Sequence, residues 1–465
     1  MSIDPETFRH EAADTVHGQL QRGRGAGYLA ALELPRAEAH RLLIDCIIRD
    51  PRIDSQVESR AEYYARLALL TKLPLEALAE RLRKHDDEGQ SGWNTPLTIS
   101  TLGELCRMGN SSAMGILRDY VGWGNWWDWA VRDLAACQDE MAWRDLDTVV
   151  CRRFPDPDQL MRELGWFKMD EPAWKVWRQT NPIVAAMMAK EEERSARLAV
   201  ESRERSGADL TVPELLARAD QANSWSFRKV IREKVQPSDA DALLAQLVAD
   251  RPFAAAVALP GLAKLSRPEF FKPLLDFWRD CPEQPRWLRS RAAYALAALP
   301  RNVVAHLIDD FFNSSDRKER FLAEAILKNH ATAEDASMLR MAITSCLQDE
   351  YEKLYRLCSL LEACKRLSGI GRIPELEQVF VECRYSYARK IAACAMQIAA
   401  PSEFDSSFST ECLWDCEADT RELGCQTVDI DRPGCLRKLR ELATDQYEEV
   451  DVRAAASLRL QGNAN

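Results

Sequence analysis

Apolar residues recur at helical spacing along almost the whole chain. Segments such as "AHRLLIDCII", "YYARLALLTKL" and "ADALLAQLVAD" place apolar residues at positions i, i+3, i+4 and i+7. The alternating pattern of β-strands is scarce, and the Asn-Gly and Asp-Gly signals of hairpin turns do not occur. Proline-containing breaks such as "FPDPDQL" and "DIDRPGC" separate the apolar segments. The pattern therefore predicts an all-α chain of many helices, each of roughly 10–18 residues.

The second half of the chain contains an internal repeat. Ala-rich helical segments each carry an arginine near their start, at successive gaps of 31, 36, 33, 32 and 32 residues; these are Arg289, Arg320, Arg356, Arg389, Arg421 and Arg453. The residue three positions after each arginine is small: Ala292, Ala323, Ser359, Ala392, Gly424 and Ala456. Small residues at one fixed point of every repeat let neighbouring helices cross closely. The spacing predicts a stack of similar two-helix units.

These repeats resemble a known family. The segments "RSRAAYALAAL" and "DVRAAASL" look like the second helix of HEAT repeats, and the short Ala-rich units are closest to the HEAT-like, phycobilisome-lyase-type variety. The resemblance covers roughly residues 209–460. It implies that each unit is a helical hairpin and that the stack is an α-solenoid with a concave face. Asp419 and Asp451 match the acidic position before the arginine, but Leu354 and Tyr387 do not, so a continuous Asp–Arg ladder is not implied.

The periodicity also predicts how the chain is divided. We expect a less regular helical region over residues 1–188 and the HEAT-like array over residues 208–465. Between them, the segment 189–207, "AKEEERSARLAVESRERSG", has opposite charges at helical spacings and few apolar residues. It reads as a solvated helix or a linker between two regions, or alternatively as an exposed helix inside one continuous array.

Four tryptophans fall within seven residues of the first half: Trp123, Trp126, Trp127 and Trp129. Asn125 is a suitable N-cap, so we expect a helix to begin at Trp126. At 100° per residue, Trp127 shares a face with Val131 and Leu134 and belongs to the core. Trp129 points away from that face, where it contacts either a neighbouring helix or a partner.

Aromatic and basic residues are the candidate partner-binding groups. Aromatic anchors in a groove are typical hot spots for protein partners, although packing between helices is an equally simple use for a tryptophan. The repeated arginines are expected to bond carboxylates or carbonyls of neighbouring repeats, or alternatively to form a row along the concave face that meets acidic peptide or phosphate groups. The candidate site residues are Trp126, Trp129, Trp143, Trp174, Trp177, Arg389, Arg421 and Arg453.

Charge and composition restrict the classes of partner. The formal net charge is −11 and the pI is about 5.3, which disfavours a large nucleic-acid footprint. The polar N-terminus does not look like a signal peptide, and the apolar run "FAAAVALPGLA" is too short to span a bilayer. We therefore expect a cytoplasmic protein whose 14 cysteines are mostly reduced core residues.

Metal and phosphate signatures are weak. Cys412, Cys416, Cys425 and Cys435 have the spacing C-x3-C-x8-C-x9-C, which lacks the paired C-x2-C of most zinc sites, and packing is the better interpretation. The glycines of "RGRGAGYL" favour a helix–helix turn over a phosphate cradle. Neither G-x-S-x-G nor H-E-x-x-H occurs. No catalytic residue, metal or cofactor is therefore predicted.

The expected function is a non-enzymatic scaffold or adaptor that binds another protein or peptide on a concave solenoid surface, an expectation that rests partly on fold analogy. One alternative is a nucleic-acid-binding protein resembling the HEAT-like DNA glycosylases, which the acidic charge opposes. Another is a bilin lyase-like enzyme, for which no specific motif is present. The sequence leaves the oligomeric state open.

Overall fold

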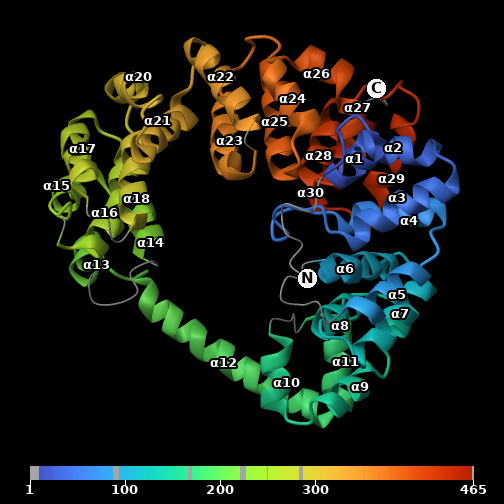
Figure 1. Ribbon diagram of the computed structural model, residues 1–465. Helices are drawn as coiled ribbons and strands as arrows, with labels where there is room; N and C mark the ends of the chain where they lie inside the picture. Colours follow the sequence, from blue (N-terminus) through green and yellow to red (C-terminus); the bar gives the residue numbers. More distant parts are fainter. Residues whose placement is uncertain are drawn as a thin grey trace. The chain divides into compact units, whose positions relative to one another are not determined.

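The computed structural model describes residues 10–86, 94–165, 170–219, 227–248, 250–281, 286–348 and 350–462. Every regular element in these ranges is a helix, which confirms the all-α prediction (Figure 1). The chain forms two compact units. Unit 1 combines residues 1–192 with residues 371–465, and unit 2 comprises residues 193–370.

The amino-terminal part of unit 1 is a cluster of short helices around one apolar core. Local capping sets several of their starts: the Asn110 side chain accepts from the Ala113 N–H, and the Asp156 side chain caps a helix that opens with Pro157. The helices are α1 (Val16–Arg22), α2 (Gly25–Glu33), α3 (Arg36–Ile48), α4 (Ala61–Thr71), α5 (Glu76–His85), α6 (Asn94–Arg107), α7 (Ser111–Val121), α8 (Trp127–Ala135), α9 (Leu146–Arg153), α10 (Pro157–Leu164), α11 (Pro172–Thr180) and α12 (Pro182–Ser206).

The carboxy-terminal part of unit 1 contains α24 (Pro374–Glu382), α25 (Ser386–Ala399), α26 (Pro401–Ser407), α27 (Ser409–Cys412), α28 (Ala418–Thr427), α29 (Cys435–Thr444) and α30 (Val450–Gln461). The helices α25, α28 and α30, which begin near the repeated arginines, pack against one another in turn. The predicted small residues lie at these crossings: Ala392 and Ala456 are fully buried, and a methyl group at Gly424 would lie 2.9 Å from the Leu413 amide nitrogen. A larger side chain there would push the helices apart.

Unit 2 follows the same scheme. Its helices are α13 (Val212–Arg218), α14 (Phe227–Lys234), α15 (Ala240–Leu244), α16 (Pro252–Leu265), α17 (Phe271–Asp280), α18 (Arg286–Ala297), α19 (Arg301–Val304), α20 (His306–Phe311), α21 (Arg317–His330), α22 (Ala336–Leu347) and α23 (Glu350–Cys364). The second helices α14, α16, α18, α21 and α23 each contact the next (Figure 1). The first helices α15, α17, α20 and α22 each pack on the second helix that follows.

The division into units differs from the predicted one. Residues 189–206 form the second half of the long helix α12, whose positions 189–201 are mostly exposed, and the boundary between the units falls inside this helix, at Glu192. Residues 371–465, however, were predicted to continue the array that begins at residue 208. They form one compact unit with residues 1–192, and polar and charged groups of the two segments bond to one another across more than 300 positions of sequence.

Among the described helices, none combines the length and the apolar character that crossing a membrane requires.

Candidate functional site

Three of the candidate tryptophans lie inside the core of unit 1. Trp143, Trp174 and Trp177 are no more than 6% exposed, and their rings meet edge to face, with centroid distances of 4.7 Å for Trp174–Trp177 and 6.4 Å for Trp143–Trp177. The Trp177 ring N–H donates to the carbonyl of Trp143 at 3.2 Å. These indoles fill the space between helices and offer no surface to a partner.

The tryptophan-rich segment around residue 127 divides between core and surface. Helix α8 begins at Trp127, one residue later than predicted. Its N-cap residue is Trp126, and the Asn125 side chain donates to the Asp86 carbonyl at 3.4 Å. Trp127 is buried, as its predicted face requires. Trp126 and Trp129 are half-buried and edge to face at 6.1 Å, so they form a small aromatic rim on unit 1.

The repeated arginines bond carbonyl groups of their own hairpins. In five of the six repeats the guanidinium donates to a carbonyl five to nine residues earlier, in the last turn of the first helix or in the loop that follows; the pairs are Arg289–Cys281, Arg320–Ser314 (and Ser315), Arg389–Phe380, Arg421–Asp415 (and Cys416) and Arg453–Gln446. Carbonyls at a helix end have no partner within the helix. We call this contact the arginine clamp. In the remaining repeat, Arg356 pairs with Glu324 of α21, with 2.6 Å between nitrogen and oxygen.

Arg389 and Arg421 also join the two segments of unit 1. Arg389 is 1% exposed; it donates to the Arg22 carbonyl near the chain's start and pairs with Asp415. Arg421 pairs with Glu448 at 2.6 Å and with Glu62 of α4 at 3.2 Å. Both candidate arginines are thus occupied inside the protein, while the candidate Arg453 is half-buried in α30.

Arg60 lies at the centre of this contact and is fully buried. Its guanidinium donates to Cys416 Sγ at 2.8 Å and pairs with Glu58 at 3.2 Å and Glu417 at 3.6 Å. Ser386 bridges the two carboxylates: its hydroxyl lies 2.9 Å from Glu58 Oε2 and bonds Glu417 Oε1. Because removing charges from water costs several kcal/mol per ion, such groups persist only when each is paired and hydrogen-bonded, as here.

The pKa shifts of Arg60 and Cys416 indicate that this buried network stabilises the fold and does not supply a nucleophile. Burial opposes the charge of Arg60, but the surrounding acidic groups outweigh it and raise the pKa of the guanidinium. Burial also raises the pKa of the Cys416 thiol well above its usual value, so it remains protonated at neutral pH and is a poor nucleophile.

The cysteines considered for a metal site are divided between two cores. Cys416 lies in the core of the amino-terminal part, while Cys425 and Cys435 lie in the core of residues 413–456. All 14 cysteines are free thiols. In the parts of the chain that the structure describes, no three His, Cys, Asp or Glu side chains are grouped as metal ligands.

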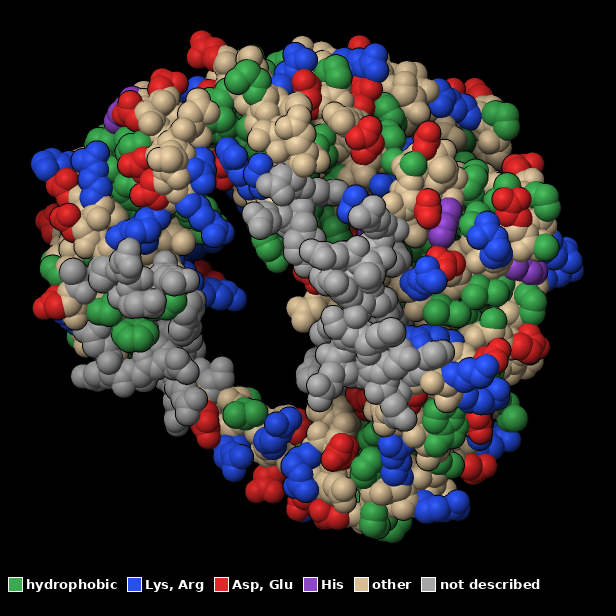
Figure 2. Space-filling model, in the orientation of Figure 1, with side chains coloured by type: hydrophobic (Ala, Val, Ile, Leu, Met, Phe, Trp, Pro, Cys, Tyr) green, Lys and Arg blue, Asp and Glu red, His purple; other side chains and the backbone are tan. Residues whose placement is uncertain are grey.

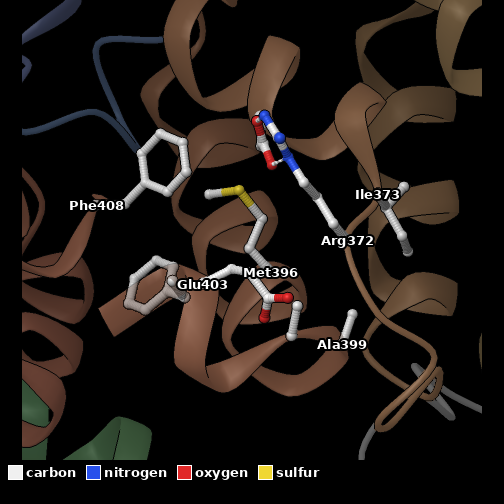
Figure 3. A pocket seen from close by; sticks show the side chains of 9 residues that line it. Arg372, Ile373, Met396, Ala399, Glu403 and Phe408 are labelled. Atoms are coloured by element: carbon white, nitrogen blue, oxygen red, sulfur yellow. Dashed lines mark hydrogen bonds and ion pairs between the residues drawn. The ribbon is translucent and has the colours of Figure 1, made fainter. Parts of the chain in front are cut away.

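Described residues of unit 1 line two small recesses. One, between α24, α25 and α26, has an apolar floor that includes Met396 and Phe408, and the ion pair of Arg372 with Glu377 lies at its rim (Figure 3). Its cavity volume is about 10 Å³, which holds about one water molecule. The other, about 20 Å³, is lined by residues that include Tyr63, Arg421 and Glu448. Both are far smaller than a site for a typical small-molecule ligand.

Unit 2 carries a partly exposed row of aromatic and basic side chains on its second helices, which we call the aromatic–arginine strip. It consists of Arg228 of α14, Phe253 of α16, Trp287, Arg291 and Tyr294 of α18, and Phe321 of α21.

Contacts across helices hold the strip together. Phe253 and Trp287 have ring centroids 5.9 Å apart, and Tyr294 and Phe321 meet edge to face at 5.4 Å. The Arg291 guanidinium lies over the Trp287 ring, 5.7 Å from its centroid. Phe253 is 43% and Tyr294 53% exposed. The aromatic residues Phe253, Trp287 and Phe321 follow one another at intervals of 34 residues, a signal that the repeat of arginines does not include, because these aromatic residues lie at different offsets from Arg289 and Arg320.

Comparison with known proteins adds no family to this description. No family model and no curated protein matches the chain. A solved crystal structure titled as an engineered protein aligns with 100% of this chain and 97% of its own length, at 14% identity and a TM-score of 0.19. A similarity this low carries no argument about fold or function.

Proposed function

We propose that this chain is a non-enzymatic interaction scaffold built from HEAT-like helical hairpins, with its partner-binding surface on the second helices of unit 2. The repeated arrangement supports the architectural half of the proposal. Successive second helices pack side by side, small residues lie at the crossings in five of six repeats, and an arginine clamp closes five of six hairpins. Stacked hairpins of this kind build a solenoid with a concave face made of second helices.

The aromatic–arginine strip is the observation that carries the binding half of the proposal. Large apolar side chains that remain exposed in a contiguous patch typically mark interaction surfaces. Tryptophan, tyrosine and arginine are the residue types most enriched at binding hot spots. The candidate residues of unit 1 are mostly buried, so the strip replaces them as the favoured docking surface.

The proposal is tested by affinity capture with the full-length protein. The protein is immobilised, exposed to cytosol of its source cells, and the retained proteins are quantified by mass spectrometry. We expect one partner in stoichiometric amount, lost from the double variant Trp287→Ala/Tyr294→Ala. Met341→Ala is the matched control, because Met341 is an exposed apolar residue of the same unit on the first helix α22. Equal retention by the double variant and the control, or no retained partner at all, contradicts the proposal.

A further inference from the structure

Basic residues are unevenly divided between the two units. Unit 2 has 27 Lys and Arg against 25 Asp and Glu, whereas unit 1 has 35 against 48. The acidic balance of the chain, which disfavours anionic partners, is therefore a property of unit 1. The partners of unit 2 depend on the charges of unit 2 itself, since interactions between exposed charges are screened beyond about 8–10 Å at ordinary salt concentrations.

Within unit 2, positive charge is concentrated on the helices that bear the strip. Helices α14, α16, α18 and α21 together carry 12 Lys and Arg against three Asp and Glu. The first helices together carry five Lys and Arg against six Asp and Glu; these helices are α13, α15, α17, α19, α20 and α22. Lys and Arg side chains gather along this edge of unit 2 in Figure 2.

The three acidic residues of the strip helices already have contacts within the unit. Glu324 accepts from Arg356 at 2.6 Å, Glu319 accepts from the Ser314 hydroxyl, and Glu233 lies 3.9 Å from Lys229. Their charges do not offset the excess of Lys and Arg on these four helices.

Two of these positive charges act on each other at the strip itself. Burial, together with the nearby charge of Arg291, lowers the pKa of Arg228 to about 10. Burial likewise lowers the pKa of Arg291, the residue that covers the Trp287 ring. A carboxylate bound beside a partly buried guanidinium favours its charged form and so offsets the cost of burial.

We propose that the aromatic–arginine strip binds an acidic linear segment of a partner protein. Its Asp or Glu side chains pair with Arg228 and Arg291, because guanidinium and carboxylate groups form strong charge-assisted hydrogen bonds. Its apolar side chains pack on the exposed rings of Phe253 and Tyr294. This inference rests on the proposed scaffold function and specifies the chemistry of its partner.

The geometry favours a peptide over a single-stranded nucleic acid. Nucleic-acid grooves present open ring faces on which successive bases stack. Here Tyr294 and Phe321 meet at 73°, so one ring points its edge at the face of the other, and Arg291 occupies a face of Trp287. The strip thus resembles a surface for alternating acidic and apolar side chains more than a ladder of stacking platforms.

The test is fluorescence anisotropy with the full-length protein and three labelled probes. The probes are a short peptide of Asp, Glu and Phe, the same peptide with Lys in place of its acids, and a short single strand of thymidine nucleotides. We expect saturable binding of the acidic peptide, weaker at high salt. Arg291→Glu should reduce its affinity at least about tenfold, because like charges then face each other. Arg291→Gln should reduce the affinity less. Because glutamine keeps a polar side chain without a negative charge, this variant separates the loss of binding from a loss of folding.

Lys272→Glu is the matched control, since it makes the same charge change on the exposed side of the first helix α17. We expect it to alter the affinity less than about twofold, as surface charges outside a contact contribute little. Tighter binding of the Lys peptide, or an equal loss of affinity in Arg291→Glu and Lys272→Glu, overturns the proposal of an acidic partner. The proposed scaffold function is not affected by that result if Trp287→Ala/Tyr294→Ala still releases the captured protein. Tighter binding of the thymidine strand, lost in Arg291→Glu, overturns both proposals and assigns the strip to nucleic acid.

Discussion

At the scale of single residues, Gly23 makes a close contact between the two segments of unit 1. This residue has φ +69°, and its backbone carbonyl accepts from the Cys416 N–H at 2.9 Å. A methyl group at Gly23 would lie 2.5 Å from Cys416 Sγ and 2.9 Å from the guanidinium carbon of Arg60. Glycine is required here both for the left-handed backbone and for the space beside the buried ion pairs.

Gly23→Ala is expected to destabilise unit 1 by about 2–5 kcal/mol, since about 1–2 kcal/mol comes from the left-handed backbone and the rest from overpacking. Gly434→Ala is the matched control: it also has a positive φ, +83°, but nothing lies within 4 Å of its added methyl group. Gly434→Ala should lower the free energy of unfolding only by the contribution of the left-handed backbone, about 1–2 kcal/mol. Urea denaturation of both variants measures the difference, and equal losses would show that the contact at Gly23 is not tight.

Asp133 of α8 is a carboxylate held in an unfavourable environment. Its side chain is 19% exposed and lies against Gly103 of α6, and its Oδ2 atom has no hydrogen bond among the described residues. Burial raises its pKa to about 7, an effect that Arg107, 3.4 Å away, only partly offsets. The folded state therefore binds a proton that the unfolded state releases at a pH near 4.

For this reason the stability contributed by protonated Asp133 is present at pH 4 and is lost as the pH rises to about 7. Asp133→Asn, which has no charge to bury, should be more stable than the wild type at pH 8, by at least about 1 kcal/mol. The advantage should shrink steadily towards pH 4. Urea denaturation across this pH range measures it, with the exposed Asp119→Asn as a control that gives no such gain. An advantage independent of pH would argue against the ionisation of Asp133 as its cause.

At the scale of elements, the repeating feature is the arginine clamp between the two helices of a hairpin. In the hairpin of α20 and α21, Arg320 donates to the carbonyls of Ser314 and Ser315 at 2.6 and 2.8 Å. Here a charged donor satisfies carbonyl groups of the loop that follows α20. The repeated arginines in the sequence thus correspond to repeated bonds that hold the loops of the hairpins. Only some of these arginines, in unit 1, also pair with buried carboxylates.

Arg320→Ala is expected to loosen this loop without unfolding unit 2. A hydrogen bond to a charged group contributes about 1.5–3 kcal/mol, so local opening of residues 312–316 should become at least about tenfold more frequent. Hydrogen–deuterium exchange of that loop measures the effect. Arg317→Ala, an exposed position of the same helix, should leave the exchange unchanged. Equal exchange in the two variants would remove the clamp as the element that orders the loop.

At the scale of the whole molecule, the chain's two ends belong to one folded unit. Besides Arg389 and Arg421, Arg24 of the α1–α2 connection pairs with Glu411 of α27 at 3.0 Å, and the Arg22 side chain donates to the Glu382 carbonyl at 2.8 Å. These pairs are buried or nearly so, and buried charges are screened by salt much less than surface charges. Unit 1 therefore needs both of its segments to satisfy its charged groups.

Fragments 1–192 and 371–465, produced together as separate chains, should form a stable complex that survives about 0.5 M NaCl. Each fragment alone should be poorly folded, because it would expose or bury unpaired charges. Size-exclusion chromatography and circular dichroism measure both outcomes. Arg389→Glu in the second fragment should abolish the complex, while Arg437→Glu, at an exposed position of α29, should not. A well-folded fragment 1–192 in isolation would contradict this account of unit 1.

Local features of this protein could be predicted from the sequence. The helical period, the breaks at Pro157 and Pro433 and the buried face of Trp127 all depend on neighbours within one or two turns. The small residues at the crossings were visible because they recur once in every repeat. Such interactions leave a period of three to four residues in the sequence. The repeat of arginines was visible for a related reason, because five of the six arginines bond a carbonyl fewer than ten residues away.

Tertiary structure alone decided which charged and aromatic residues are available to a partner. Arg389 and Arg421 look like exposed members of a row until Arg22 and Glu62, more than 350 positions away, are placed beside them. Phe253, Trp287 and Phe321 come from separate hairpins and meet only through the packing of α16, α18 and α21. Which side chains of distant segments meet, and which remain exposed, depends on how the helices pack. A single sequence therefore carries the helices and their local bonds, whereas the contact between residues 1–192 and 371–465 and the exposure of the strip arise only in the tertiary structure.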